Sequence, residues 1–438
     1  MKRIIPVLTC ALLAFALLSC SAQEQDRQNK QADLKVQMYM RSILKTWEMK
    51  TVADVPGYTF APDPSLTPSC SNCPPKVDPA TGAVTTYNPD FAFFVKKGDP
   101  TKLLVFFMGG GACWDITNCV YNHTYSESLF ESVELLGLVS SGLGAQQGIG
   151  GFLDTHNQDN PFKDWTIVYV PYCTGDLNAG QEDHVYTDTY NTADPIANVT
   201  IRHRGAVNRD LVLKWMEANI PPAGVAQLFV TGLSAGSYAS LLAFPYLRDI
   251  YTGGTAYYLG DAGVGYAGID SGGNHFTDIA KDRWNVQLPA AVFGTTDIST
   301  FDEYKDVVHE GVDYYRTNKP GDRFAQYTTK YDKTQTWFYN IQVGDHIEYP
   351  DFWGSESGAN PDLWVYKAWS DGMLDAIDIG LSNYAYYIGA GTDHTIIFSD
   401  KVYTETSGST SFLGWVDSLI NDVGIPASTA CTVCNAPF

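Results

Sequence analysis

Short apolar runs alternate with amphipathic segments over most of the chain. Runs rich in β-branched and aromatic residues predict strands at 103–107, 167–170, 226–230, 255–259, 323–329 and 384–388. Apolar positions at helical spacing predict helices at 35–52, 206–218, 237–247 and 411–420. This alternation predicts βαβ units, and therefore an α/β fold with a mostly parallel central sheet and helices on both faces.

The N-terminal segment has the pattern of an export signal. Lys2 and Arg3 precede an apolar stretch, residues 4–18, that is too short to span a membrane. The stretch ends in Leu17-Leu18-Ser19-Cys20, which resembles a bacterial lipobox. We therefore expect a signal peptide over 1–19, lipidation of Cys20 and a polar tether over 20–34. An ordinary signal with a chance cysteine is the alternative.

The rest of the chain, 35–438, is expected to be a single domain. An N-terminal helix and an irregular arm would occupy 35–89, and a lid-like insertion would occupy about 333–380. These expectations describe an exported bacterial lipoprotein, at the outer membrane, the cell surface or in the periplasm.

Composition limits the function classes. With 438 residues, of which 45% are hydrophobic and 18% charged, the chain can bury a large core without a partner, so a monomer is expected. The formal net charge of −21 excludes nucleic acid as a partner, because phosphate binding needs a basic face. It also disfavours a polyanionic substrate, unless the cleft is locally neutral.

The cysteines predict disulfides, which persist outside the cytoplasm. Cys113 and Cys119 are near enough to close a small loop. Two CxxC pairs lie near opposite ends of the domain, Cys70 with Cys73 and Cys431 with Cys434. We expect them to cross-link the termini, and a zinc site is the alternative. Cys173 would then be left over.

A candidate nucleophile lies in Gly232-Leu233-Ser234-Ala235-Gly236. This G-x-S-x-G spacing falls between a predicted strand and a predicted helix, the context of a nucleophile elbow. The glycines allow a sharp turn, and the turn would hold Ser234 at the carboxyl edge of the sheet. A small residue in a tight turn is the alternative interpretation.

A serine nucleophile also needs donors for the oxyanion of the tetrahedral intermediate. The glycine-rich segment Gly109-Gly110-Gly111 follows a predicted strand. We expect the amides of Gly110, Gly111 and Ala235 to form the oxyanion hole. A phosphate-binding loop is disfavoured, because no Gly-Lys-Ser/Thr follows.

Five motifs together resemble the pectin acetylesterase/Notum family, over about residues 87–419. They are Gly109-Gly110-Gly111-Ala112-Cys113 with Cys119, Pro171-Tyr172-Cys173, Ser234-Ala235-Gly236, Asp261-Ala262-Gly263 and Tyr331-Asp332 with Gln335. The resemblance implies an α/β-hydrolase fold and hydrolysis of small acyl esters. The chain departs from the family at Ser237, usually glycine, at Ala112, usually tryptophan, and in lacking a cysteine beside His394.

The resemblance and the chain order serine, acid, histidine indicate the other catalytic residues. His394 follows the last long strand and is the expected general base, with His275 and His346 as weaker candidates. Asp332 is the expected acid and falls on the family's Tyr-Asp-x-x-Gln motif. Asp261 is its rival, while Asp393 is interpreted as a solvated loop residue.

Many aromatic side chains lie between the acid and the histidine, and they could line the cleft or only pack a lid. They are Trp337, Phe338, Tyr339, Tyr349, Phe352, Trp353, Trp364, Tyr366 and Trp369. The candidate residues predict a serine esterase that needs no metal or organic cofactor. The resemblance implies O-acetyl groups on a polysaccharide such as pectin as its substrate. The alternatives are a short-chain lipid esterase, a polyester depolymerase and a non-catalytic carbohydrate-binding lipoprotein.

Overall fold

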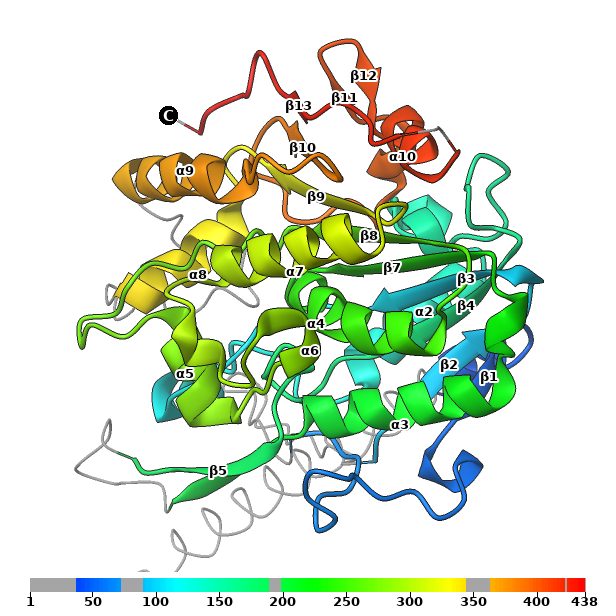
Figure 1. Ribbon diagram of the computed structural model, residues 1–438, viewed down its shortest axis with the longest axis horizontal. Helices are drawn as coiled ribbons and strands as arrows, with labels where there is room; N and C mark the ends of the chain where they lie inside the picture. The colour runs from blue at the N-terminus through cyan, green and yellow to red at the C-terminus, as the bar shows by residue number, and fades with distance from the viewer. Residues whose placement is uncertain (1–36, 72–89, 189–197, 344–362, 422–423, 438) are drawn as a thin grey trace, which may run out of the picture.

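A nine-stranded sheet has the order β1-β2-β4-β3-β7-β8-β9-β10-β13 (Figure 1). The computed structural model describes residues 37–71, 90–188, 198–343, 363–421 and 424–437. The strands are β1 (Glu48–Lys50), β2 (Phe93–Lys96), β3 (Asp99–Phe107), β4 (Trp165–Val170), β7 (Gln227–Leu233), β8 (Thr255–Asp261), β9 (Arg323–Thr329), β10 (Tyr384–Gly389) and β13 (Thr429–Ala430). From β4 to β13 the neighbours are parallel, while β1 and β2 add an antiparallel edge. The predicted mostly parallel α/β sheet is confirmed.

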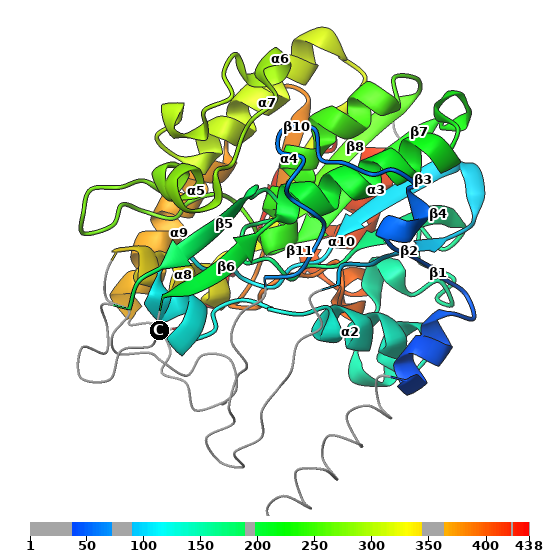
Figure 2. The ribbon, with the colours of Figure 1, turned by 90° about the horizontal axis from the view of Figure 1, so that it is seen from below.

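Helices cover both faces of this sheet, as predicted (Figure 2). They are α2 (Phe130–Ser140), α3 (Gly205–Asn219), α4 (Ala235–Ile250), α5 (Phe276–Trp284), α6 (Ala290–Phe293), α7 (Tyr304–Asn318), α8 (Lys333–Val343), α9 (Leu363–Ile377) and α10 (Phe412–Asn421). The two-stranded ribbons are β5 (Glu182–Tyr186) with β6 (Val199–His203), and β11 (Thr406–Ser407) with β12 (Thr410–Ser411). Helices α3, α4 and α7 lie on one face, and α2 and α10 lie on the other.

Aromatic side chains form much of the contact between the helices and the sheet. On the α4 face, the ring of Phe324 lies 4.8 Å from Phe244 and 5.6 Å from Tyr315. On the opposite face, Phe412 of α10 lies 5.0 Å from Tyr327. Burial of each ring removes a large apolar area from water. The aromatic contacts on both faces of the sheet therefore stabilise the packing of the helices on the strands.

The N-terminal prediction is wrong in part. Residues 37–43 are helical, but Glu48–Lys50 form β1 instead of continuing a helix to residue 52. Trp47 is buried, with its ring 6.4 Å from that of Tyr169, and β1 pairs with β2. The backbone must leave the helix to make both contacts. The signal peptide, the tether and Cys20 lie outside the described residues.

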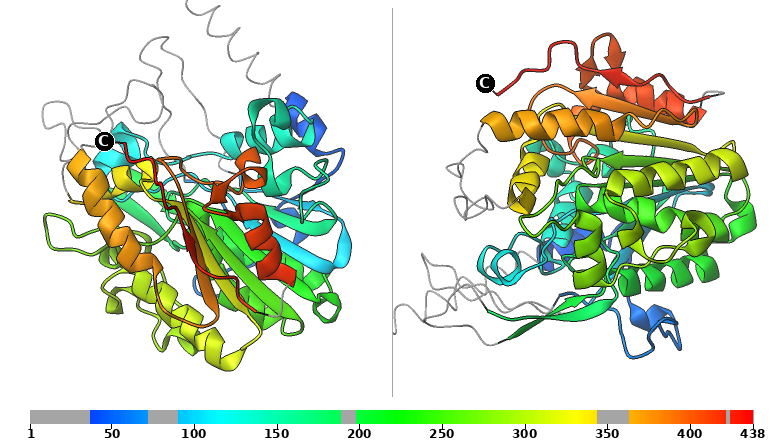
Figure 3. Two further views of the ribbon diagram at one scale, coloured as in Figure 1. Left: turned by 90° about the horizontal axis from the view of Figure 1, so that it is seen from above. Right: turned by 60° about the vertical axis from the view of Figure 1, so that its left-hand side comes forward.

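The expected cross-link between the terminal cysteine pairs is also wrong. Cys70 pairs with Cys173, and Cys431 pairs with Cys434. The arm reaches Cys173 after β4, where Ser71 N–H donates to the Cys173 carbonyl at 3.0 Å. Cys434 instead follows β13, at the far edge of the sheet near the C-terminus (Figure 3). This pairing also removes the thiols on which the zinc alternative depended, except Cys73, which is not among the described residues.

The third disulfide joins Cys113 to Cys119, as predicted. Three disulfides indicate an extracellular protein, because such bonds persist in oxidising compartments. Among the described residues, no helix combines the length and the apolar character needed to cross a membrane.

The Cys70–Cys173 bond should contribute strongly to stability, because it closes a loop of sequence separation 103. We expect the double variant Cys70→Ser/Cys173→Ser to lower the free energy of unfolding by about 2–5 kcal/mol. The matched variant Cys431→Ser/Cys434→Ser removes a bond between residues only 3 apart in sequence, so its free energy of unfolding should decrease much less. Denaturant unfolding midpoints and slopes compare the two, and equal losses would contradict this account.

Candidate functional site

The carboxyl ends of neighbouring parallel strands bring the candidate residues to one edge of the sheet. Gly110 and Gly111 follow β3, Ser234 follows β7, and Asp261 ends β8. Asp332 follows β9 and His394 follows β10. These strands are consecutive in the sheet, so residues far apart in the sequence meet at the position where α/β folds bind ligands.

Ser234 occupies a strained turn between β7 and α4. Its φ of 54° and ψ of −124° lie in a region that non-glycine residues rarely adopt. The turn is also crowded: a Cβ on Gly232 would lie 2.1 Å from the Gly236 carbonyl oxygen, and a Cβ on Gly236 would lie 2.1 Å from that of Phe107. Both positions therefore require glycine, which explains the G-x-S-x-G spacing.

Asp332 and His394 form a hydrogen-bonded pair. His394 Nδ1 lies 2.9 Å from Asp332 Oδ1 and 2.8 Å from Oδ2, and Asp332 is fully buried. The rival Asp261 makes no hydrogen bond to His394 among the described contacts. The geometry therefore favours Asp332 as the partner of the imidazole.

Gln335 fixes the Asp332 carboxylate, a role that sequence reasoning missed. Its backbone N–H donates to Asp332 Oδ1 at 2.9 Å, and its Nε2 donates to Oδ2 at 3.0 Å. Gln335 Oε1 accepts from the Val264 N–H at 3.1 Å, so the side chain is itself held. The signal was the Asp-x-x-Gln spacing at the start of a helix, which is a helix-capping pattern.

The charges around His394 raise its pKa. Burial disfavours the imidazolium, but the charge of Asp332, its hydrogen bond and the charge of Asp261 outweigh burial and raise the pKa of His394 above its usual value. With Nδ1 bonded to Asp332, Nε2 lies on the other side of the ring, where it is buried and has no hydrogen-bond partner. This nitrogen is available to accept a proton.

The other predicted candidates lie elsewhere. Asp393 is exposed and pairs with Lys401, as expected of a solvated loop residue. His275 precedes α5 and does not line the pocket that contains Ser234, and His346 is outside the described residues. Burial raises the pKa of Asp261 to about 7, although two backbone amides donate to its carboxylate.

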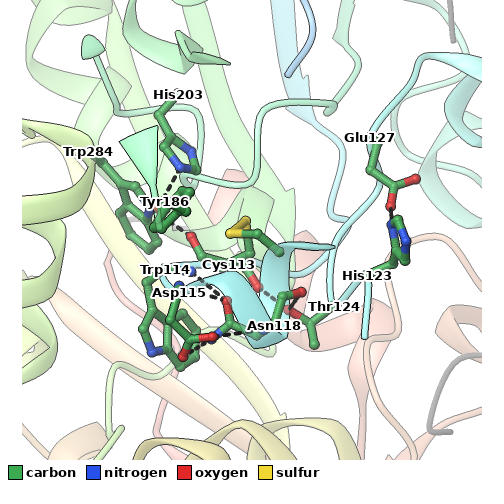
Figure 4. The surroundings of a disulfide bond; sticks show 12 residues. Cys113, Trp114, Asp115, Asn118, His123, Thr124, Glu127, Tyr186, His203 and Trp284 are labelled. Atoms are coloured by element: carbon green, nitrogen blue, oxygen red, sulfur yellow. Dashed lines mark hydrogen bonds and ion pairs between the residues drawn. A yellow bond between two sulfur atoms is a disulfide. The ribbon is translucent and has the colours of Figure 1, made fainter. Parts of the chain in front are cut away.

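The glycine loop lies between β3 and the Cys113–Cys119 disulfide. Gly111 has a φ of 73°, and a Cβ there would lie 2.1 Å from the Thr124 carbonyl oxygen. Figure 4 shows Trp284 and Thr124 beside this loop; Trp284 Nε1 donates to the Cys113 carbonyl at 2.8 Å. These contacts make the loop rigid, as an oxyanion hole requires. Gly111 and Ala235 line the pocket, while Gly110 does not.

The same region contains a group with metal-ligand atoms. Cys113, Cys119 and His203 place their sulfur and nitrogen atoms within 4.8 Å of one another. The two sulfurs are bonded to each other, so neither is a thiolate ligand. His203 Nε2 lies 2.8 Å from the Tyr186 hydroxyl, and Nδ1 lies 2.9 Å from the Thr174 carbonyl. These contacts and its burial, which lowers the pKa of His203 to about 3, describe a neutral structural histidine.

Ser234 and His394 line one pocket of about 60 Å³. Its walls are mainly aromatic side chains and alanines. They come from the glycine loop and the residues after it, from α4, α5 and α8, and from the segment that follows β8. The aromatic wall residues are Trp114, Tyr238, Tyr266, Phe276, Phe338 and Tyr339. The arrangement can hold a small apolar group beside a serine hydroxyl and a basic imidazole.

The insertion before His394 contributes to this pocket in part. Phe338 and Tyr339 of α8 line it, whereas Trp337 and Trp369 are buried and Trp364 is 54% exposed. Tyr349, Phe352 and Trp353 lie outside the described residues. Of the departures from the family, Ala112 lines the pocket, whereas Ser237 does not and contacts the Gly263 carbonyl.

Comparison with known proteins agrees with this geometry. Residues 83–291 match the family model described as Pectinacetylesterase. This region is therefore similar to the pectinacetylesterase family. It includes the glycine loop and Ser234, while Asp332 and His394 lie beyond the matched region.

Solved structures have a similar fold. The crystal structure of the Wnt deacylase Notum from Drosophila, crystal form II, is 17% identical and covers 79% of this chain and 93% of its own, with a TM-score of 0.51. Crystal form I is 16% identical with the same coverage and a TM-score of 0.47. No curated protein matches the chain. The implied α/β-hydrolase fold is therefore confirmed.

The raised pKa of His394 makes a prediction about pH. A general base must be neutral. We therefore expect the rate at which a fluorophosphonate labels Ser234 to decrease as the pH is lowered, with a midpoint above about 6.5, the usual value for histidine. Asp332→Asn removes the charge that raises this pKa. It should move the acid limb to lower pH and slow labelling by about 10²- to 10⁴-fold.

Asp393→Asn is the matched control for this experiment, because Asp393 is adjacent to the histidine but exposed. Its acid limb should coincide with that of the wild type. An unchanged limb in Asp332→Asn would contradict the assignment of Asp332.

Proposed function

We propose that the protein is an exported serine esterase that hydrolyses short acyl esters, with O-acetyl groups on a polysaccharide such as pectin as the preferred substrate. The observation that supports it most is one apolar pocket containing both Ser234, on a strained strand-to-helix turn, and His394, paired with buried Asp332. The match of residues 83–291 to the Pectinacetylesterase family model supports this activity.

In the proposed mechanism His394 is the general base. Nε2 takes the proton from the Ser234 hydroxyl, and Oγ attacks the ester carbonyl carbon. Amides of the glycine loop and of Ala235 stabilise the oxyanion, and the Ala235 N–H is in the first turn of α4, where amides lack an intrahelical acceptor. His394 returns the proton to the departing alcohol. It then deprotonates the water that releases the acid from the acyl-enzyme.

The size of the pocket supports a short acyl group. A cavity needs roughly 15 Å³ to hold one water molecule, so about 60 Å³ has room for a few non-hydrogen atoms. An acetyl group fits this space. Phe338 lies across the loop, because a Cβ on Gly111 would be 3.3 Å from its Cζ, and it limits the room for a longer chain.

One residue in the pocket wall supports a substrate whose alcohol part carries further free hydroxyl groups, as a sugar does. Gln342 is 2% exposed and lines the pocket; its Nε2 donates to the Asn274 carbonyl, while its Oε1 is buried without a partner. A buried acceptor without a donor is costly, and a sugar hydroxyl would satisfy it. A triacylglycerol, or a unit inside a polyester chain, has no free hydroxyl beside its ester.

The proposal includes the setting of the enzyme. The three disulfides agree with a location outside the cytoplasm. Lipidation of Cys20 would hold the enzyme at a membrane, and the catalytic unit would be a monomer. The mechanism is assigned entirely to side chains and backbone amides, so it uses no cofactor.

The first test is the loss of turnover in Ser234→Ala. We expect kcat for 4-nitrophenyl acetate to fall by about 10⁴-fold or more, with loss of fluorophosphonate labelling. Ser141→Ala, an exposed serine at the end of α2, is the matched control and should behave as wild type. A folded wild type that is neither labelled nor active would instead indicate a carbohydrate-binding protein.

The second test separates the substrate classes. Gln342→Leu should lower kcat/KM for acetylated pectin or xylan by about 10-fold, the value of one hydrogen bond, and leave 4-nitrophenyl acetate nearly unchanged. Gln146→Leu, on the surface, controls for the substitution. Equal effects on both substrates would contradict the contact. Preferred turnover of tributyrin or a polyester would favour the lipid or polyester alternative.

A further inference from the structure

Asp261 connects the two catalytic segments of the chain. It is the last residue of β8, where it pairs with Leu233 of β7, and its side chain is fully buried. Its backbone carbonyl accepts from the Ser234 N–H at 2.7 Å. Its carboxylate Oδ2 accepts from the Ile396 N–H at 2.7 Å and from the Ile397 N–H at 2.8 Å. One residue is therefore bonded to the serine turn and to the segment directly after His394.

The segment that carries His394 needs such an anchor. Thr395, the next residue, has a φ of 63°, which is unfavourable for a β-branched side chain and persists only where the surroundings impose it. Before the histidine, Tyr331 N–H donates to Gly391 and Lys333 N–H donates to Thr392, at 3.1 and 3.0 Å. After the histidine, the two amides on Asp261 hold the chain. His394 lies between these two attachments.

We propose that Asp261 is a positioning residue that sets the place of His394 relative to Ser234 through the backbone of Ile396 and Ile397. This inference rests on the proposed esterase function. Asp261 itself is held, because the N–H of Ala262 donates to the Tyr327 carbonyl at 2.8 Å across the β8–β9 edge. Hydrogen bonds therefore connect the sheet, through Asp261, to the backbone segment that carries the imidazole.

The hydrogen bonds, not the charge, make this connection. Both amides donate to Oδ2, whereas Oδ1 is buried without a partner. A proton on Oδ1 would leave both amide bonds in place, and burial, which raises the pKa of Asp261 to about 7, favours the neutral form. An asparagine can present its oxygen to the same two amides, so it is a suitable neutral substitute.

The test compares Asp261→Asn, which keeps the acceptor, with Asp261→Ala and Asp261→Val, which remove it. We expect kcat for 4-nitrophenyl acetate to fall by about 100-fold in the Ala and Val variants, the loss that a displacement of about 1 Å can cause. KM should change by less than about 3-fold, because the pocket wall is intact. Asp261→Asn should retain kcat to within about 5-fold of the wild type.

Asp322→Asn and Asp322→Ala are the matched controls. Asp322 is also buried, and it accepts from the Ala256 N–H at the other end of β8, where it pairs with Arg248. These variants test the general effect of losing a buried aspartate far from the pocket. Their thermal midpoints should fall, but kcat of the folded protein should not.

Three results would overturn the proposal. The first is a folded Asp261→Ala or Asp261→Val variant with wild-type kcat, and the second is an Asp261→Asn variant as inactive as the Ala and Val variants are expected to be. The third needs no variant: rapid hydrogen exchange of the Ile396 and Ile397 amides in the folded wild type, where slow exchange is expected. Absence of wild-type labelling and turnover would instead mean failure of the esterase function, so the two failures are distinguishable.

Discussion

The close approach of three backbone segments at the Ser234 turn is the constraint on which the rest of the site depends. Gly236 lies against the end of β3, and Gly232 lies against Gly236, at separations that leave no room for a side chain. The turn from β7 into α4 can be this sharp only under those conditions, and Ser234 then takes its unfavourable backbone conformation. The contacts that hold the turn therefore come from neighbouring strands as well as from the turn itself.

The order of the parallel strands brings the strained serine turn together with the other candidate residues. Because β3, β7, β8, β9 and β10 are adjacent and end at the same edge, each contributes a different element of the chemistry. The residues proposed as oxyanion loop, nucleophile, anchor, acid and base come from five successive strand ends. Buried Asp332 and Asp261 act together on His394, one by a direct hydrogen bond and one through the field of its charge. Their combined effect exceeds the cost of burying the imidazolium.

The parallel strands and the serine turn could be predicted from sequence because their signals are local. Continuous apolar runs such as β4 mark buried strands, and G-x-S-x-G reports a steric requirement within five residues. Disulfide pairing depends on which strand ends are neighbours, so Cys173 was wrongly left without a partner. The role of Gln335 was missed although its spacing from Asp332 is a helix-capping signal. The contact of Asp261 with the segment after His394 also escaped prediction, because hydrogen bonds to backbone amides leave little trace in the side-chain pattern.

The neutral lining of the pocket explains how an acidic protein could act on the proposed anionic substrate. A net charge of −21 repels a polyanion such as pectin. The described residues that line the pocket, however, include no carboxylate and no lysine or arginine. Exposed charges more than about 8 Å apart are largely screened at physiological ionic strength, so the acidic surface acts weakly on an ester at the pocket mouth. Inside, apolar walls exclude water and strengthen the few polar contacts that chemistry needs. Under the proposed function, binding would therefore depend on the neutral acyl group and on hydroxyl contacts rather than on the charge of the polymer.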